Sequence, residues 1–278
     1  MFHASTEYKI HFSTPFVEKY IKPYIFKLKP HEWSYIAGLV DSDGSITIGR
    51  VGKSKNYVKY RPEVYIANNS QVLMQWLKEH VPYHNVHTTN SGCHMFAIYN
   101  LGAVYTTLLN IVDRVVLKHH VAKLALKLAY MKIVHYRSKN KAIHDKYNSI
   151  FKEVKQLNRS LYGFSLDKYN NYYEQASKEE LYAYLAGVVD GDGSISVMRD
   201  GGLLLSIGTR HGEYAKWLQH HISGSYITFS RNTKGNIVYN VMLRGRLTVL
   251  ELLYRLEPHL VVKRDKARKI IESFSSFT

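Results

Sequence analysis

The chain is poor in cysteine and in long apolar runs. Its single cysteine, Cys93, excludes an internal disulfide framework and a cysteine-based zinc cluster, and is typical of a reducing compartment. No run approaches the about 18 apolar residues of a membrane-spanning helix. The first 30 residues have neither the continuous apolar core of a signal peptide nor the arginine of a transit peptide. We therefore expect an intracellular protein without a membrane partner.

Acidic residues are also scarce relative to basic ones. The 278 residues include 22 Asp and Glu against 38 Lys and Arg, which gives a formal net charge of +16. Such a charge favours an anionic partner, of which nucleic acid is the usual one. Richness in Lys, Tyr, Asn and Ile is typical of an AT-rich genome, such as that of a mitochondrion or chloroplast, and this suggests an organellar protein.

One segment of the sequence occurs twice. The stretch "YIAGLVDSDGSI" begins at Tyr35, and "YLAGVVDGDGSI" begins at Tyr184, with only three differences in a gapless alignment. Neighbouring segments recur as well: "QWLKEHV" returns as "KWLQHHI", and "LKHHVAKLAL" returns as "VKRDKARKII". Self-similarity at this long period indicates an internal duplication.

Each copy has the same expected order of helices and strands. Ser177 and Glu180 stand at capping-box spacing, which predicts a helix that ends near Asp190. Alternating polar and apolar residues then predict strands, including a hairpin that turns at Lys234 and Gly235. In the first copy, helices are expected near 70–81, 103–114 and 118–136. The predicted fold class is α+β, with two pseudo-symmetric α-β-β-α-β-β-α units, a further helix after each, and one antiparallel sheet per unit.

The repeat also predicts the domain boundaries. We expect an N-terminal extension at 1–30, a first unit at 31–137, a helical linker at 138–176 and a second unit at 177–278. The chain is long enough for each unit to bury its own core.

The acids that close each copy suggest a metal site. The calcium loop of an EF-hand does not fit, because neither copy has glycine at the sixth position and glutamate at the twelfth. A purely structural alternative is that aspartate caps a turn and glycine ends the helix. The intact duplication of "DSDG" and "DGDG" favours a functional role.

Two glycines lie in the middle of the predicted repeat helices. Gly38 and Gly187 each cost about 1 kcal/mol relative to alanine in a helix, and close packing of the two helices would compensate for this. Such packing would bring together the helix ends with Asp43 and Asp192, whose like charges call for a divalent cation. Two carboxylates with Mg²⁺ beneath a basic surface are typical of phosphodiester cleavage.

The two copies closely resemble the motif of the LAGLIDADG homing endonucleases, in the form with both motifs on one chain. The resemblance covers nearly the whole chain from about His31. It implies an intron-encoded, site-specific double-strand DNA endonuclease that cuts a long target by metal-dependent hydrolysis and leaves 3′ overhangs. It also implies two antiparallel sheets that form a saddle on the DNA major groove.

The resemblance also implies roles for individual residues. Asp43 and Asp192, with backbone near Gly44 and Gly193, would bind two or three Mg²⁺ ions. Lys118 and Lys263, each four residues before an alanine, match the basic residues near the scissile phosphates, although a lysine there can also be a simple phosphate contact. The polar positions at the end of the second strand correspond to Asn68 and Thr209, of which threonine is the less typical.

The polar faces of the strands are expected to read the DNA. A two-stranded ribbon fits the major groove, where side chains contact base edges. The candidates are Ser45, Thr47, Lys59, Arg61, Glu63 and Tyr65 in the first unit, and Ser194, Ser196, Ser206, Tyr226, Thr228, Ser230 and Asn240 in the second. A basic loop between Arg50 and Lys59 is expected to touch the DNA backbone. Because the two faces differ, we expect an asymmetric double-stranded target and a monomeric protein.

Two pairs of adjacent histidines raise the question of zinc. The pairs are His119 with His120 and His220 with His221. Adjacent side chains on a helix point about 100° apart, and no cysteine assists, so a structural zinc site is not expected.

Other functions remain open for this fold. An intein is not expected, because the sequence has Met1 and ends in "SSFT" rather than a His-Asn pair. An intron RNA maturase and a non-cleaving DNA-binding protein are the remaining alternatives. Retention of both motif acids and both lysines favours cleavage.

Overall fold

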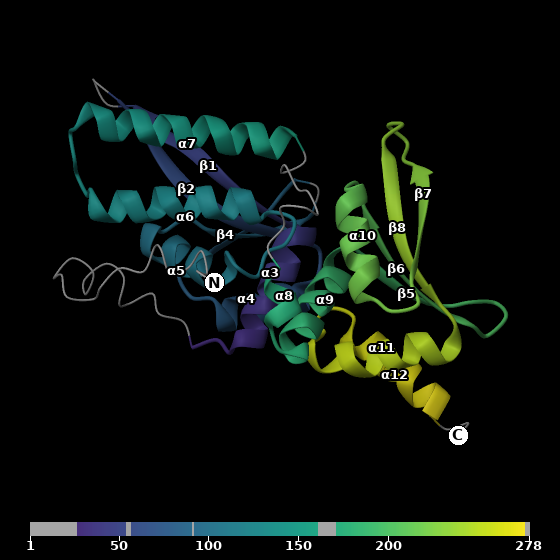
Figure 1. Cartoon of the computed structure of the whole chain (residues 1–278). Coiled ribbons are helices and arrows are strands. Elements are labelled where there is room, and N and C mark those ends of the chain that lie inside the picture. Colours follow the sequence, from purple (N-terminus) through teal and green to yellow (C-terminus); the bar gives the residue numbers. More distant parts are fainter. Residues whose placement is uncertain (1–26, 54–56, 91, 161–170, 276–278) are drawn as a thin grey trace. The chain divides into compact units, whose positions relative to one another are not determined.

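The computed structural model describes residues 27–53, 57–90, 92–160 and 171–275, which form two compact units (Figure 1). Most of the expected N-terminal extension and residues 161–170 of the expected linker lie outside the described residues. The first unit lies within Asp43–Gly163, and the second combines Pro30–Ser42 with Phe164–Thr278. Within the described ranges, no helix is both long and apolar enough to cross a membrane.

The first unit contains a four-stranded antiparallel sheet. Its strand order is β1-β2-β4-β3. The elements are β1 (Gly44–Lys53), β2 (Val58–Asn68), α4 (Gln71–His80), β3 (Asn85–Thr88), β4 (His94–Ile98), α5 (Leu101–Ile111), α6 (His119–Val134) and α7 (Lys141–Arg159). Pairing of β1 with β2 extends into the basic segment expected as a loop, as far as Lys53 and Val58, and residues 54–56 of that segment lie outside the described residues.

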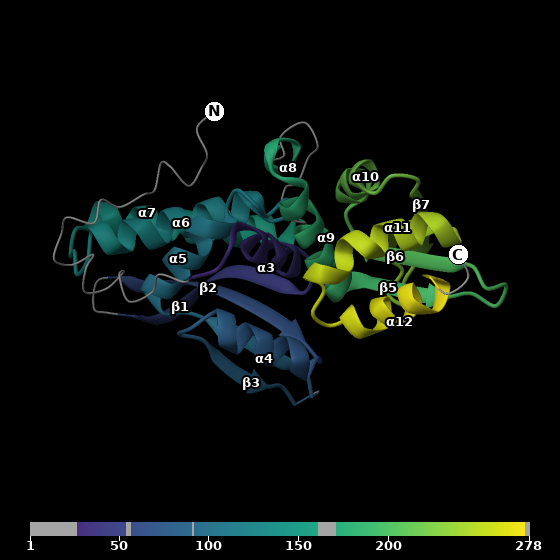
Figure 2. The same ribbon diagram turned by 90° about the horizontal axis from the view of Figure 1, so that it is seen from below.

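The second unit repeats this arrangement, with strand order β5-β6-β8-β7. Its elements are α3 (Pro30–Ser42), α8 (Tyr172–Gln175), α9 (Lys178–Asp192), β5 (Gly193–Val197), β6 (Leu203–Thr209), α10 (Gly212–His221), β7 (Tyr226–Arg231), β8 (Ile237–Arg244), α11 (Arg246–Leu256), η4 (Glu257–His259) and α12 (Arg264–Ser275). Figure 2 shows α11 beside α12, and α11 also packs on β6 and β8. The predicted α+β class and the order of elements in each repeat are confirmed.

Buried and partly exposed side chains alternate along β6, so the two faces of its sheet differ in burial. Leu203, Leu205 and Ile207 are buried, while Leu204 and Ser206 point to the opposite, partly open face. Period-two burial of this kind is what an antiparallel sheet needs when helices cover one side only. The remaining face is therefore free to carry polar side chains.

Helix α7 is one of the helices that pack on the first sheet. Figure 1 shows it beside α6, and it packs on β1 and β2. The Tyr60 hydroxyl donates to Asn148 Oδ1 at 2.7 Å, and Asn158 Nδ2 donates to the carbonyl of Ile46 at 3.1 Å. The segment expected as a linker thus contains a helix, as the sequence indicated, and that helix packs on the first unit.

Glycine is required where α3 crosses α9. A Cβ atom on Gly38 would lie 2.1 Å from the carbonyl oxygen of Tyr184, and one on Gly187 would lie 2.2 Å from that of Tyr35. No rotamer change relieves a clash with backbone. The expected close approach of the two repeat helices is therefore confirmed, and it explains how two glycines are tolerated inside helices.

Two buried hydrogen bonds cross between these helices. The Tyr35 hydroxyl donates to Asp190 Oδ2 and the Tyr184 hydroxyl donates to Asp41 Oδ2, each at 2.8 Å. Burial, with the nearby Asp41 carboxylate as the next cause, raises the pKa of Tyr184 well above its usual value. Tyr184 thus stays protonated at physiological pH and donates to Asp41 throughout that range.

Candidate active site

The first motif acid, Asp43, directly follows α3 and precedes β1. Asn68, the last residue of β2, donates from Nδ2 to Asp43 Oδ2 at 2.6 Å, and the Ala67 backbone donates to the Asp43 carbonyl at 3.1 Å. Asn68 Oδ1 in turn accepts from the Ser70 backbone at 2.8 Å. Asn68 is thus fixed at both ends of its amide, and the structure brings this predicted site residue into direct contact with Asp43.

The second motif ends at Asp192, the exposed last residue of α9. Gly193 follows, and its N–H donates to the carbonyl of Val189. A Cβ atom on Gly193 would lie 2.7 Å from Val189 Cα, so the turn out of α9 needs glycine here. This tight turn presents the Asp192 carboxylate at the C-terminal end of α9, where the negative end of the helix dipole favours a nearby cation.

Lys263 is held against the same helix by Asp190. Lys263 Nζ donates to the Asp190 carbonyl at 2.6 Å, and its backbone N–H donates to Asp190 Oδ1 at 2.8 Å. Asp190 Oδ2 accepts from the backbone of Val261 at 2.7 Å and of Val262 at 3.0 Å, in addition to Tyr35. The structure therefore brings this predicted lysine to the end of the second motif.

Thr209 shares one backbone contact with its repeat counterpart, whereas Lys118 differs from its counterpart in burial. The Thr209 hydroxyl accepts from the backbone of His211 at 3.2 Å, much as Asn68 accepts from Ser70. Lys118 is 2% exposed and precedes α6, whereas Lys263 is half-buried. Lysine is almost never buried to this degree unless the fold supplies it with partners.

Asp41 and Asp190 are site residues whose roles sequence reasoning missed. It assigned a metal role only to the last acid of each motif, Asp43 and Asp192. Asp41 and Asp190 are 3% and 1% exposed, they accept from the Tyr184 and Tyr35 hydroxyls, and Asp190 also accepts from the Lys263 backbone. The signal that could have found them is their identical place in both copies, at the end of an apolar helix. A carboxylate at such a place needs donors within the fold.

We expect Asp190→Asn to lower the free energy of unfolding by about 3 kcal/mol, because its amide would point a donor at backbone N–H groups that already need an acceptor. Urea unfolding at pH 7 measures the change. Asp200→Asn is the matched control, since Asp200 is an exposed carboxylate that also accepts from a backbone N–H, that of Gly202. Equal effects of the two changes would contradict the role given to Asp190.

Each motif end by itself offers donors of the kind that hard divalent cations prefer. Asp43 and Asp192 offer carboxylate oxygens, and the tight turns offer backbone carbonyls. Oxygen ligands of this kind are those that Mg²⁺ and Ca²⁺ prefer. Both acids are accessible to solvent, since neither is buried. The residues present are therefore compatible with the metal ions that the motif implies.

On the first sheet, Arg61, Glu63 and Tyr65 form one cluster. Arg61 Nε and the Tyr65 hydroxyl each donate to the Glu63 carboxylate at 2.7 Å, and Arg61 stacks over the ring of Tyr99. Glu63 is 6% exposed, so the expectation that it stands in solvent is wrong, because its neighbours cover it. Burial, together with the bond to Glu63, raises the pKa of Tyr65 to about 12.

The other first-sheet candidates are more accessible. Ser45 and Lys59 are exposed, and Thr47 is partly exposed opposite Glu63 in the register of β1 and β2. Gly49, beside this pair, leaves room for Glu63, because a Cβ there would lie 2.8 Å from its Oε1. Ser45, Thr47 and Lys59 therefore remain available for contacts outside the unit.

On the second sheet, the register aligns the candidate side chains across the open face. Ser194 pairs with Ser206, and their hydroxyls lie 2.9 Å apart. Ser206 in turn pairs with Met242, which pairs with Tyr226. The remaining second-sheet candidates, none of them buried, are Ser196, Thr228, Ser230 and Asn240. Met242, which accepts from the Thr228 hydroxyl at 3.2 Å, was missed because methionine has no polar signature.

These observations define the class of fold. Two motif helices cross through glycine, each motif ends in an accessible acid, and each repeat has a four-stranded antiparallel sheet with one open polar face. This is the fold of the LAGLIDADG homing endonucleases, in the form with two motifs on a single chain.

Solved structures support this assignment of the fold. The I-SmaMI LAGLIDADG homing endonuclease bound to cleaved DNA matches with a TM-score of 0.64 at 14% identity, over 89% of each chain. I-GzeII in complex with its DNA target matches with a TM-score of 0.63 at 18% identity, over 91% of this chain and 94% of that one. I-LtrWI bound to target DNA matches with a TM-score of 0.60 at 14% identity, over 89% and 90%.

No family model matches the sequence, and no curated protein matches it significantly. The similarity therefore lies in the fold and in the two short motifs, and the activity has to be argued from the site.

Proposed function

We propose that the protein is a site-specific DNA endonuclease that cuts both strands of a long asymmetric target with the help of divalent metal ions. The observation that carries the proposal is the retention, at both motif ends, of an accessible acid, Asp43 and Asp192, each within its own supporting turn. Similar proteins point the same way: I-SmaMI has been solved bound to an uncleaved DNA target in the presence of calcium ions.

Each residue of the site has a role in this proposal. Asp43 and Asp192 would hold the ions, which when bound supply Lewis-acid stabilisation of the phosphate and activation of water. Asn68 would orient the Asp43 carboxylate, because its Nδ2 donates to that group. Lys263, held by Asp190, would present its ammonium beside the second motif, and Lys118 is proposed as its counterpart in the first. We propose Mg²⁺ as the physiological ion.

The open faces of the two sheets would contact the DNA. Arg61 is pre-organised by Glu63 and Tyr99, which suits bidentate recognition of guanine. On the second sheet the candidates are short hydroxyl side chains with Asn240 and Tyr226. Because the two faces carry different chemistry, we propose an asymmetric target bound by one chain. A net charge of +16 supplies the attraction for phosphate.

Cleavage of a randomised duplex library tests this function. The protein is incubated with the library and Mg²⁺, or with EDTA, and the cut ends are sequenced. We expect enrichment of one long asymmetric sequence with 3′ overhangs, dependent on the metal. The same library incubated without protein is the control for background breaks.

Two outcomes would overturn the proposal. Binding to DNA without cutting in any divalent metal would favour a DNA-binding protein of the same fold. Preferential binding to a structured intron RNA over every duplex would favour a maturase. An intracellular, organellar location stays a prediction from composition.

A further inference from the structure

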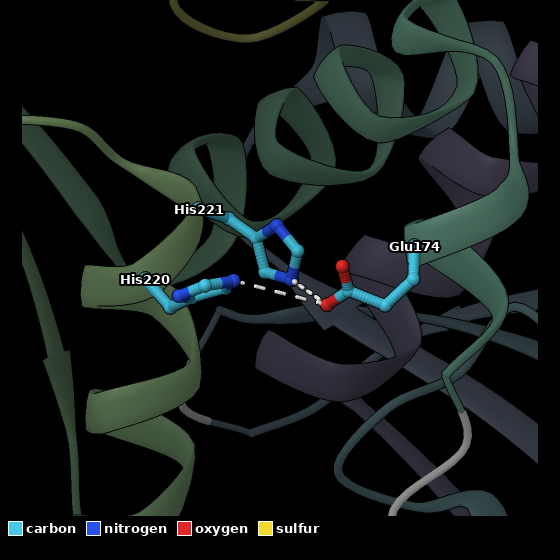
Figure 3. A group of neighbouring side chains, drawn as sticks. All are labelled: Glu174, His220 and His221. Carbon is cyan, nitrogen blue, oxygen red and sulfur yellow. Dashed lines mark ion pairs between the residues drawn. The ribbon is translucent and has the colours of Figure 1, made fainter.

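Two adjacent histidines of the second unit converge on one glutamate. His220 and His221 are the last residues of α10, and Glu174 comes from α8 (Figure 3). Nε2 of His220 lies 3.9 Å and Nε2 of His221 lies 3.5 Å from Oε1 of Glu174. One potential ligand atom from each residue lies within 4.8 Å of the others. Three potential metal ligands thus meet at one point.

The His221 side chain is buried, although it lies at the end of a surface helix. Its side chain is 8% exposed and packs against Trp217, with 4.2 Å between ring centroids. Its buried Nε2 has no hydrogen-bond partner among the described residues. An imidazole nitrogen held in this way is a common metal ligand. A buried, aimed nitrogen of this kind needs a ligand.

The ligand set suits a borderline transition metal. Two imidazole nitrogens and one carboxylate oxygen form a set found in zinc sites with an open fourth position. Zn²⁺ binds imidazole at about 2.0–2.1 Å, so tetrahedral ligand atoms lie roughly 3.3 Å apart. The two separations between imidazole nitrogen and carboxylate oxygen, 3.5 and 3.9 Å, are close to this value, and the three ligand atoms all lie within 4.8 Å of one another.

The surroundings also favour a cation. The site lies at the C-terminal end of α10, where the helix dipole is negative. It faces a cavity of about 460 Å³, which leaves room for a water molecule as the fourth ligand. The cavity is also lined by Lys178 and Arg255, and Arg255 is paired with Glu251, which offsets its charge.

We propose that Glu174, His220 and His221 form a Zn²⁺ site, separate from the motif acids, that ties α8 to the end of α10. The sequence argument against zinc considered only the histidine pair. It could not include Glu174, which lies 46 residues away. In the corresponding turn of the first unit, Glu79 and His80 take the places of His220 and His221, and His80 Nδ1 contacts the carbonyl of Trp76.

Zinc content after gel filtration tests the proposal. The full chain is incubated with zinc chloride and an excess of Mg²⁺. The Mg²⁺ occupies sites made of oxygen ligands, so that zinc bound there is not counted, but it binds imidazole poorly. We expect one Zn²⁺ per chain. His220→Ala and Glu174→Gln, both at exposed positions, should weaken binding more than about 100-fold, because even loss of an outer-shell partner costs about 10–100-fold. Cobalt(II) should give the visible absorption of a tetrahedral site.

The first histidine pair offers a matched control. His120→Ala changes the pair of His119 and His120. Among the described residues this pair forms no three-ligand group with an acid, so the variant protein should still bind zinc. Zinc should also raise the melting temperature of the full chain but not that of His220→Ala. Equal zinc content in the full chain and in both site variants, or no zinc in any of them, would overturn the proposal.

Discussion

Replacement of both Asp43 and Asp192 by asparagine is expected to abolish DNA cleavage while DNA binding persists. Each carboxylate would lose the negative charge that holds a divalent ion, and metal stabilisation is worth several kcal/mol, or more than about 10³-fold in rate. The fold should tolerate the change, because Asp192 is exposed and an amide oxygen at position 43 can still accept from Asn68. Single-turnover cleavage of the selected target, with binding measured by gel shift, gives both quantities.

Asp145→Asn is the matched control for that double variant. Asp145 is an exposed carboxylate of α7, so its loss changes the charge of the chain without touching either motif. The control should cleave at the rate of the unchanged chain. If the double variant cleaved as fast as the control, the assignment of the site would be wrong even though the fold is right.

Gly38→Ala is expected to destabilise the second unit by more than about 3 kcal/mol. Overpacking a core commonly costs about 1–3 kcal/mol, and the cost is higher here because the new methyl group would clash with backbone atoms, which cannot change rotamer. The new Cβ would lie 2.1 Å from the Tyr184 carbonyl oxygen, and α3 would have to move away from α9. That movement would also strain the bonds from Tyr35 to Asp190 and from Tyr184 to Asp41. Gly187→Ala should destabilise the unit by a similar amount, because its new Cβ would lie 2.2 Å from the Tyr35 carbonyl oxygen on the opposite helix.

Gly208→Ala separates this steric effect from the general effect of replacing glycine. A Cβ at Gly208 would lie 3.6 Å from the nearest atom, Oδ1 of Asn240, which is ordinary contact. Its free energy of unfolding should change by less than about 0.5 kcal/mol, as for most surface substitutions. Thermal unfolding followed by circular dichroism measures all three variants. A stable Gly38→Ala protein would mean that the two helices are not packed this closely.

Local sequence signals predicted the elements well. Ser177 was expected as a helix cap, and its hydroxyl accepts from the Glu180 backbone at 3.2 Å. The hairpin of β7 and β8 turns where Lys234 and Gly235 indicated, with Gly235 at a φ of 77°. Helix α9 continues to Asp192, two residues past the expected end, because the Gly193 N–H still bonds to Val189. Such signals depend on a few neighbouring residues.

Long-range partners were not predictable in the same way. The alternation of polar and apolar residues along β2 assigned Glu63 to the open face. Glu63 is nevertheless buried, because Arg61 and Tyr65 donate hydrogen bonds to its carboxylate and cover it. Asp190 was given no role of its own from the sequence, although its carboxylate accepts from Lys263 and Tyr35, which lie in distant parts of the chain. Alternation gives the direction of a side chain, but burial depends on what its neighbours do.

The sequence by itself determined the duplication, the element order, the need for glycine at Gly38 and Gly187, and the choice of Asp43 and Asp192 as candidate ligands. These follow from local propensity and from comparison of the chain with itself. Only the tertiary structure decided that Asp190 holds Lys263, that Glu63 organises Arg61, and that Glu174 meets His220 and His221. The physical reason is that a polar group buried by folding must find partners in space, and sequence separation does not limit which they are.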